Sequence, residues 1–195
     1  MSSLILLGVD TGQVNAIFEK LENNDKANQA LKQALNETAK QARERLSEQA
    51  KKIYTIKKTA FRKDMKIKKA TVSKPQVSIV STGRANSLSD FRVSPATVRN
   101  GNNRPKITKG KVLKSSRMKR LEKGGIKAFL VKFKSGHKAV VERTSKKRLP
   151  IRVLYSPSDP VMLGSEKRTY GIVEPYIERD LHENLHHFIE QALGG

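Results

Sequence analysis

The 195-residue sequence contains no cysteine and no tryptophan, and aromatic residues make up only 5% of it. The absence of cysteine excludes disulfide bonds, thiolate metal ligands and a cysteine nucleophile. The scarcity of aromatic side chains predicts a modest, aliphatic core and argues against a platform that stacks nucleic-acid bases. The apolar run at Leu4–Leu7 is too short for a signal peptide or a membrane span, so neither is expected.

Acidic residues are also scarce, with 18 Asp and Glu against 40 Lys and Arg, which gives a net charge of +22. The excess is concentrated in residues 49–158, which carry 31 basic and 4 acidic side chains. Such a block repels itself unless a negative partner lies nearby. Nucleic acid is the first candidate partner, because lysine and arginine release counterions from phosphates. An acidic protein surface is the second candidate, and a merely soluble basic surface is the third.

A long amphipathic helix is predicted in the first third of the chain. Apolar and small residues recur every three to four positions from Leu31 to Ile53, and no Pro or Gly interrupts residues 25–58. The face is rich in alanine, which permits close packing inside the chain or against another subunit, and we expect the former. A shorter helix is expected at residues 13–22.

A second amphipathic helix is predicted at the C-terminal end. Its apolar stripe runs from Ile177 to Ala192, and we expect Pro175 in its first turn, where proline is tolerated. Between the two long helices, β-strands are predicted from alternation at residues 76–81 and from β-rich runs that flank turn residues. The runs 127–133 and 138–143 surround a four-residue link with a glycine and predict a hairpin, and 151–155 is a third strand.

These elements predict an α+β fold, in which a long N-terminal helix and a C-terminal helix pack on a small, mainly antiparallel β-sheet. Residues 1–24 are expected to form a short helix or arm. Residues 25–195 are expected to form a single α+β domain. Residues 82–125, which are rich in Gly, Ser, Asn, Pro and basic residues, are expected to form a long, irregular basic loop or arm within it.

Two short patterns resemble protease signatures. Residues 182–186 read HENLH and match the H-E-x-x-H motif of zinc proteases. The only downstream carboxylate, Glu190, lies on the same helix, and both histidines lie about 100° from the apolar stripe. We therefore interpret them as residues beside a core-packing face. Asp10-Thr11-Gly12 occurs once and precedes a helical pattern, so we interpret it as a helix N-cap rather than an aspartic-protease loop.

No credible active site, cofactor, metal site, nucleotide-binding loop or small-molecule substrate is expected. Three basic strips, at residues 51–74, at residues 99–123 and beside the hairpin, are instead candidate contacts with phosphates or with an acidic partner. The candidate contact residues are Lys57, Lys58, Arg62, Lys63, Lys66, Lys68, Lys69, Arg104, Lys106, Lys109, Lys111, Lys114, Arg117, Lys119, Arg120, Arg143, Lys146, Lys147 and Arg148.

Three stretches resemble a known family. They are KKATVSKPQVSI (residues 68–79), KAFLVKFKSGHKAVVERTSKKRLPIRVLYSPSDPVML (residues 127–163) and the C-terminal helix with its E-R-x-L pattern (residues 178–193). On these stretches the chain resembles the phage minor tail protein Z family, the tail-completion proteins of long-tailed phages and prophages. The middle stretch is the most specific of the three.

The resemblance implies a structural, non-enzymatic component that completes the head-proximal end of the tail of a phage, prophage or tail-like particle, at its neck or collar. It implies a homo-hexameric ring beside the tail tube, a tail terminator and head–tail connector subunits, assembled in the bacterial host cytoplasm. It implies no contact with a membrane. It leaves open whether the basic strips bind DNA, which they would do without sequence specificity, or bind acidic neighbouring subunits. The alternatives are a general nucleic-acid-binding protein that contacts phosphates and, ranked last, a zinc protease at residues 182–186.

Overall fold

The structure, a computed structural model, describes residues 2–7, 24–57, 61–99 and 101–193. The helix predicted at residues 13–22 and the Asp10-Thr11-Gly12 pattern lie outside the described residues. Within the chain, contacts gather into two compact units, which are described separately. The first unit comprises Met1–Ala50, Phe61–Gly83 and Pro160–Gly195, and the second comprises Lys51–Ala60 and Arg84–Asp159.

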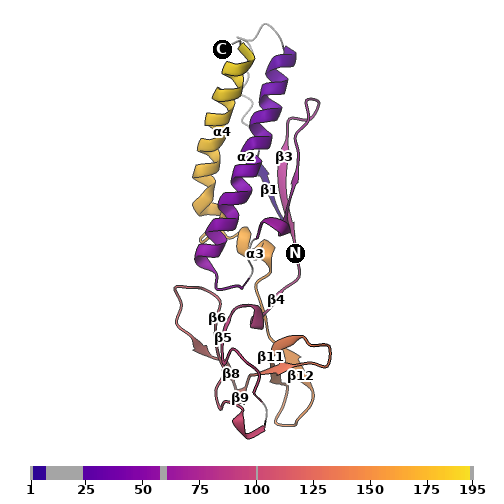
Figure 1. Cartoon of the computed structure of the whole chain (residues 1–195), viewed down its shortest axis with the longest axis vertical. Helices are drawn as coiled ribbons and strands as arrows, with labels where there is room; N and C mark the ends of the chain where they lie inside the picture. Colours follow the sequence, from indigo (N-terminus) through magenta and orange to yellow (C-terminus); the bar gives the residue numbers. More distant parts are fainter. Residues whose placement is uncertain (1, 8–23, 58–60, 100, 194–195) are drawn as a thin grey trace. The chain divides into compact units, whose positions relative to one another are not determined.

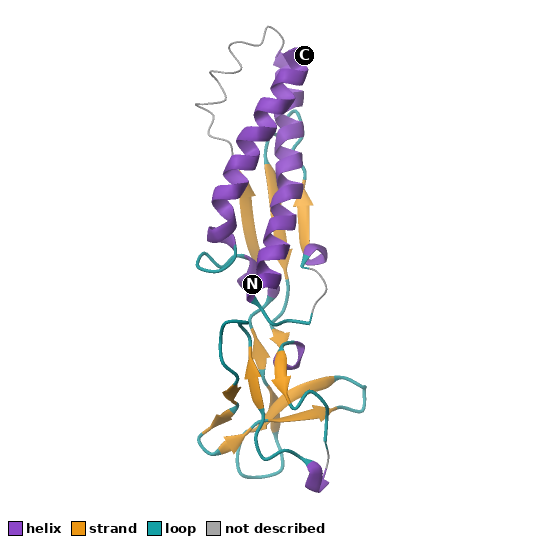
Figure 2. Cartoon of the chain, turned by 60° about the vertical axis from the view of Figure 1, so that its left-hand side comes forward, coloured by secondary structure: helices purple, strands orange, loops and turns teal. Residues whose placement is uncertain are grey.

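The first unit consists of two long helices beside a three-stranded antiparallel sheet (Figure 1). The sheet has the strand order β1-β3-β2, so β3 is central and both of its neighbours pair with it. The strands run along one side of the helix pair (Figure 2). The elements are β1 (Ser2–Leu7), α2 (Asn24–Ile53), the 3-10 turn η1 (Arg62–Asp64), β2 (Met65–Lys68), β3 (Val77–Thr82), α3 (Asp159–Leu163) and α4 (Tyr170–Leu193).

Helix α2 is the centre of the first unit because it is buried along much of its circumference. The predicted stripe is confirmed, with Leu35, Thr38 and Leu46 fully buried. The buried surface is wider than that stripe, since alanines at other positions are also inaccessible to solvent. These alanines are Ala27, Ala30, Ala34 and Ala39, and the two alanines of the predicted stripe, Ala42 and Ala50, are buried as well. Small side chains let neighbouring backbones approach the helix closely, which favours packing on more than one side.

Helices α2 and α4 lie side by side and are joined by polar contacts as well as by apolar packing (Figures 1 and 2). Arg45 of α2 forms a bidentate ion pair with Asp180 of α4, at 2.6 Å from Nε and 2.8 Å from Nη2. The amide of Asn184 donates to the buried hydroxyl of Thr38 and to the Gln41 side chain, both at 2.9 Å. The hydrogen bond to Asp180 raises the pKa of Arg45, which therefore stays charged in this pair.

The second unit is built from short antiparallel strands and contains a β10-β11-β12 sheet, a β5-β6-β7 sheet and two paired ribbons, β8-β9 and β13-β4. Its core contains Leu88, Val93, Ala128, Leu130 and Val140. The elements are β4 (Asn86–Ser87), η2 (Leu88–Asp90), β5 (Arg92–Ser94), η3 (Gly101–Asn103), β6 (Lys109–Lys111), β7 (Lys119–Arg120), β8 (Glu122–Lys123), β9 (Ile126–Lys127), β10 (Phe129–Lys132), β11 (Lys138–Arg143), β12 (Ile151–Val153) and β13 (Tyr155–Ser156).

The α+β class and the predicted hairpin are confirmed. Strands β10 and β11 pair in the register Phe129↔Val141, and β12 joins β11 on its other side. Gly136 sits in the turn with φ at +83°, a conformation that favours glycine, and its amide donates to the carbonyl of Phe133 at 2.9 Å. The strand predicted at residues 76–81 is β3.

Helix α2 ends at Ile53, the last residue of the predicted apolar stripe, and the residues that follow bond to the β6 region, with Thr55 N–H donating to the carbonyl of Val112 at 2.8 Å. Two strands in the first half of the chain differ from the prediction. The first basic strip, residues 51–74, contains strand β2, whose apolar Met65 and Ile67 alternate with lysines. Strand β1 was not predicted. The prediction that residues 25–195 form a single domain stays a prediction.

Two further differences concern residues 82–125 and Pro175. The stretch predicted as an irregular basic loop contains strands β4 to β8, and Phe91 within it is fully buried. Helix α4 begins at Tyr170, so Pro175 lies inside the helix rather than in its first turn. The earlier start follows from the preceding turn, in which Val173 N–H already donates to the carbonyl of Thr169 at 3.1 Å. Pro175 is exposed.

Removing the Asp180 carboxylate should destabilise the first unit through loss of the ion pair. Asp180→Ala should lower the free energy of unfolding by about 2 kcal/mol, because it leaves a partly buried guanidinium without its two acceptors. Equilibrium urea unfolding measures this, with Glu183→Ala as the control. Glu183 is an exposed carboxylate on the same helix, and its substitution should cost less than about 0.5 kcal/mol. Equal losses for the two variants would contradict the prediction.

Substituting the glycine near the start of α4 should also destabilise the unit. A Cβ at Gly171 would lie 2.3 Å from the backbone carbonyl oxygen of Glu166. Gly171→Ala should therefore cost about 2 kcal/mol, although alanine is the better helix former. Ile172→Ala, at an exposed neighbouring position, is the matched control in the same urea titration. A gain in stability for Gly171→Ala would contradict the prediction, because it would mean that the turn before α4 relieves the clash with no loss of folding free energy.

Candidate nucleic-acid and partner interface

Positive charge is divided very unequally between the two units. The sequence stretches 51–60 and 84–159 of the second unit hold 25 Lys and Arg and 4 Asp and Glu, a net charge of +21. The stretches of the first unit hold 15 basic and 14 acidic residues, a net charge of +1. The first unit can neutralise its own charges in pairs such as Arg45–Asp180, whereas the second needs a negative partner from outside.

The first predicted strip is split between the units. Arg62 and Lys63 lie on η1, and Lys66 and Lys68 lie on strand β2, with Lys69 directly after it. All five are exposed residues of the first unit, and the guanidinium of Arg62 is paired with Glu44 at 2.6 Å. Lys57 lies in the second unit, where its ammonium donates to the carbonyl of Ser89 at 2.9 Å. Lys58 lies outside the described residues.

The second and third strips both belong to the second unit. Lys109, Lys111, Lys119 and Arg120 lie on the paired strands β6 and β7. The candidate contact residues of these two strips are all exposed except Lys111 and Arg143, which are half-buried. The remaining members are Arg104, Lys106, Lys114, Arg117, Lys146, Lys147 and Arg148.

The structure brings part of the second strip against part of the third. A pocket of about 440 Å³ is lined by Arg104 and Lys106 from one strip and by Arg143 and Lys146 from the other. Lys127 is a fifth cation in its wall, and the remaining lining residues are neutral. Among the residues that the structure describes, no carboxylate side chain lines this pocket, which is therefore a concave surface of one sign of charge.

Phe129 organises the two arginines of this pocket. The guanidinium of Arg104 lies over its ring at 4.8 Å from the centroid, and that of Arg143 lies at 5.8 Å. The hairpin register explains the second contact, because Phe129 pairs with Val141 and Arg143 follows two residues later on the same face. A cation held over an aromatic face keeps its N–H edge available for an anion.

Lys127 and Phe129 are candidate residues that the charge pattern did not predict. The sequence KAFLVKF was assigned to a hairpin strand, and no ligand contact was expected from it. The signal that could have identified them is the pairing register of the two hairpin strands. In a hairpin closed at residues 134–137, Lys127 and Phe129 fall opposite the end of the second strand, where Arg143 and the third basic strip follow.

The H-E-x-x-H pattern lies on the solvent-facing side of α4, as interpreted from the sequence. His182, Glu183 and His186 are all exposed, and His186 lies 3.3 Å from Glu190 on the same helix. The core-facing positions are Ile177, Asp180 and Leu185. Among the residues that the structure describes, no group of three His, Cys, Asp or Glu side chains could hold a metal ion.

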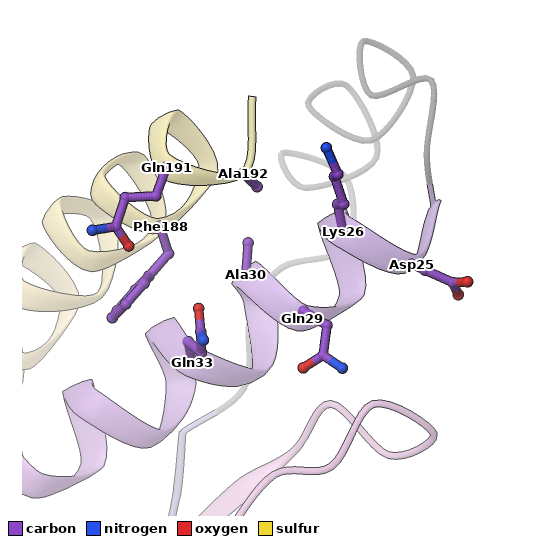
Figure 3. A pocket seen from close by; sticks show the side chains of 8 residues that line it. All are labelled: Asp25, Lys26, Gln29, Ala30, Gln33, Phe188, Gln191 and Ala192. Carbon is purple, nitrogen blue, oxygen red and sulfur yellow. The ribbon is translucent and has the colours of Figure 1, made fainter. Parts of the chain in front are cut away.

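A second hollow lies in the first unit, between the start of α2 and the end of α4, and has a volume of about 420 Å³. Phe188 extends from α4 toward α2, and Ala30 lies on the side of α2 that faces α4, whereas Asp25 and Gln29 point away from α4 (Figure 3). Its lining is mostly neutral, with glutamines rather than converging charges, so it has none of the electrostatic character of the pocket in the second unit. No helix in the described part of the chain has the length and apolar character of a membrane span.

The charge of the second unit should make stability depend on salt. Because like charges oppose the compact state and salt screens them, the melting temperature should rise by about 3 °C between about 0.02 M and about 0.3 M NaCl. Lys147→Glu/Arg148→Glu should reduce this rise in a calorimetric salt series. The matched control, Lys167→Glu/Arg168→Glu, reverses two exposed cations of the near-neutral first unit and should leave the rise unchanged. A salt-independent melting temperature would contradict this account of the charge.

Comparison with known proteins identifies the family. The family profile described as prophage minor tail protein Z (GPZ) matches residues 11–193, nearly the whole chain, and the chain belongs to this family. It is therefore a phage tail component, found in the virion or tail with other tail proteins as its neighbours. No curated protein and no solved structure gives a significant match.

Proposed function

We propose that this member of the prophage minor tail protein Z family completes the head-proximal end of the tail, where its second unit presents a cationic surface to DNA or to acidic neighbouring subunits. The protein acts as a structural part at the neck or collar and performs no chemical reaction. The copies form a ring around the tail axis, which we take to be homo-hexameric. The tail tube, or a tail terminator, and the head–tail connector are its neighbours.

The observation that carries this proposal is the division of charge. Nearly all of the net charge resides in the second unit, with 25 basic and 4 acidic residues. That unit consists of short strands and loops that display most of its cations to solvent. A surface of this kind binds a polyanion without reading sequence, because its contacts are with phosphates or carboxylates rather than with bases. The head-proximal end of a tail is where packaged DNA leaves the head.

The first unit suits protein contacts better than DNA contacts. Its net charge is +1, and helix α4 exposes Ile172 and Tyr176, which are 42% and 48% accessible. These residues lie one turn apart on one helix, and the ring of Tyr176 also packs against Arg45 and Arg179. We assign contacts with tail proteins to this unit and contacts with the polyanion to the second.

Labelling of particles tests the position. A small epitope tag on the protein, detected by electron microscopy of particles from the native host, should place label only at the head-proximal collar. Label along the tube, at the distal tip, or on nucleoid DNA rather than on particles would contradict the proposal. The last outcome would favour the alternative, a general nucleic-acid-binding protein.

Charge reversal in the second unit tests its role in the particle. Lys146→Glu/Lys147→Glu/Arg148→Glu should lower the yield of infectious particles at least ten-fold while the amount of assembled tail tube stays unchanged. Lys167→Glu/Arg168→Glu, in the first unit, is the control and should have little effect. If the variant is missing from tails made without heads, acidic subunits are the partner. If it is present there and the block appears only with DNA-filled heads, DNA is the partner. Normal infectivity of the triple variant would overturn the cationic role.

A further inference from the structure

We propose that the pocket between β9, β10 and the end of β11 is a binding site for the phosphates of a nucleic-acid backbone. Its functional residues are Arg104, Lys106, Lys127, Phe129 and Arg143. The inference rests on the proposed function, because it assigns the polyanion contact of the second unit to one place. It goes further by naming the ligand class, the residues that bind the ligand, and the aromatic ring of Phe129 that orients two of them.

The first argument is the way in which the two guanidiniums are held. Surface arginines ordinarily lose considerable rotamer freedom when they bind an anion. Here Arg104 and Arg143 converge from distant parts of the sequence on one ring, at 4.8 Å and 5.8 Å from its centroid. Phe129 is itself fixed by strand β10. The site is therefore partly organised before the ligand arrives, which lowers the entropic cost of binding.

The second argument is an unsatisfied donor in the wall of the pocket. The Nε atom of Arg143 is buried and has no hydrogen-bond acceptor among the described residues. Buried donors are nearly always paired in proteins, and a charged one is costly to leave unpaired. Nε is inaccessible in the free chain, so a phosphate oxygen would satisfy it only after the Arg143 side chain turns toward the pocket, and the terminal N–H groups of the guanidinium would bind the same or the next phosphate.

The third argument is that the acidic residues of the second unit do not neutralise the pocket. Glu142 precedes Arg143 on β11 but points to the opposite face, where it is paired with Arg152 directly across from it. Asp159 accepts a hydrogen bond from Asn86 at 3.1 Å, and Asp90 lies on η2 outside the pocket. Glu122, the fourth acidic residue of the second unit, pairs with Lys127 in the β8-β9 ribbon. Arg104, Lys106, Arg143 and Lys146 thus keep their charge for a ligand.

The spacing of the charges favours a nucleic-acid backbone over an acidic peptide. The two strands of B-DNA together present one charge about every 1.7 Å along the helix axis, whereas an extended peptide that is acidic at every second residue presents one charge about every 6.7 Å on one face. Five cations around a pocket of about 440 Å³ are neutralised more completely by two adjacent phosphates than by a single carboxylate. The dense charge of this pocket therefore matches the denser polymer.

The test is a salt titration of binding to a fluorescein-labelled duplex DNA of about 20 base pairs, followed by fluorescence anisotropy with the full chain. Lys106→Ala should weaken binding and reduce the slope of log K against log salt by about 0.9, the contribution of one phosphate contact. Phe129→Leu and Arg143→Lys keep the charge, so each should weaken binding roughly three- to ten-fold at an unchanged slope. That combination is what a positioning role predicts.

Matched controls exist on the same hairpin. Phe133→Leu removes a ring that stacks on His137 instead of lying beneath arginines, and Lys134→Ala removes an exposed cation outside the pocket. Both controls should bind the duplex within about two-fold of the unmodified chain. Thermal melting of each variant verifies that it is folded. Because Arg143→Lys preserves volume and charge, it keeps the test valid even if Phe129→Leu does not fold.

The outcomes separate this inference from the proposed function. If the pocket variants bind DNA like the controls while binding stays salt-dependent, the pocket is not the phosphate site, but the proposal that the second unit binds a polyanion is kept. If polyglutamate binds more tightly than the duplex and the pocket variants lose that binding, the ligand is an acidic protein and the nucleic-acid assignment is overturned. If the unmodified chain does not bind DNA, the pocket proposal fails, whereas the position in the tail is decided independently by the particle labelling.

Discussion

The burial of helix α2 is the constraint on which the first unit depends. Its alanines at positions such as 34, 39 and 42 are fully inaccessible, so the helix has neighbours on more than one side. Segments that are far apart in the sequence meet on this helix. Asn36 exchanges two hydrogen bonds with the backbone of Ala70, beyond β2, and Arg45 holds Asp180 of α4. A larger residue on this surface would push away either the sheet or α4, because a packed core absorbs added volume only with strain.

This arrangement explains why the charge can be so uneven. The first unit supplies a core of its own and pairs its charges across α2 and α4, so it needs little from the second. The second unit has a smaller core, centred on Leu130 and Val140, and its strands are short. Its outward positions carry lysine and arginine because packing makes no demand on them. A compact unit with a net charge of +21 is tolerable only if salt or a bound polyanion screens the repulsion.

Much of the fold could be predicted because it follows from periodicity. The 3.6-residue repeat identified α2 and α4, and alternation around a glycine identified the β10-β11 hairpin. The burial of Asp180 could not be predicted, since a carboxylate on an apolar face is stable only through Arg45, which is 135 positions away. Strand β2 was missed because lysine density concealed the alternation of Met65 and Ile67. Residues 82–125 looked irregular because their strands are two or three residues long, below the length at which alternation is visible.

The candidate site could likewise be predicted only in part from the sequence. Charge density alone predicted Arg104 and Arg143 as candidate contact residues, but density is a property of the whole unit and does not select one place within it. Selection needs the tertiary register, which sets Phe129 beneath both guanidiniums and turns Glu142 to the other face. The lysines on β6 and β7 have equal charge and no such organisation, so they can add to attraction at a distance but offer no preformed geometry. A polyanion would therefore approach the entire second unit and be held at the one place where two arginines are already oriented. Attraction by the whole unit and binding at one pocket both work without a sequence preference, which agrees with the proposed position beside the DNA that leaves the head.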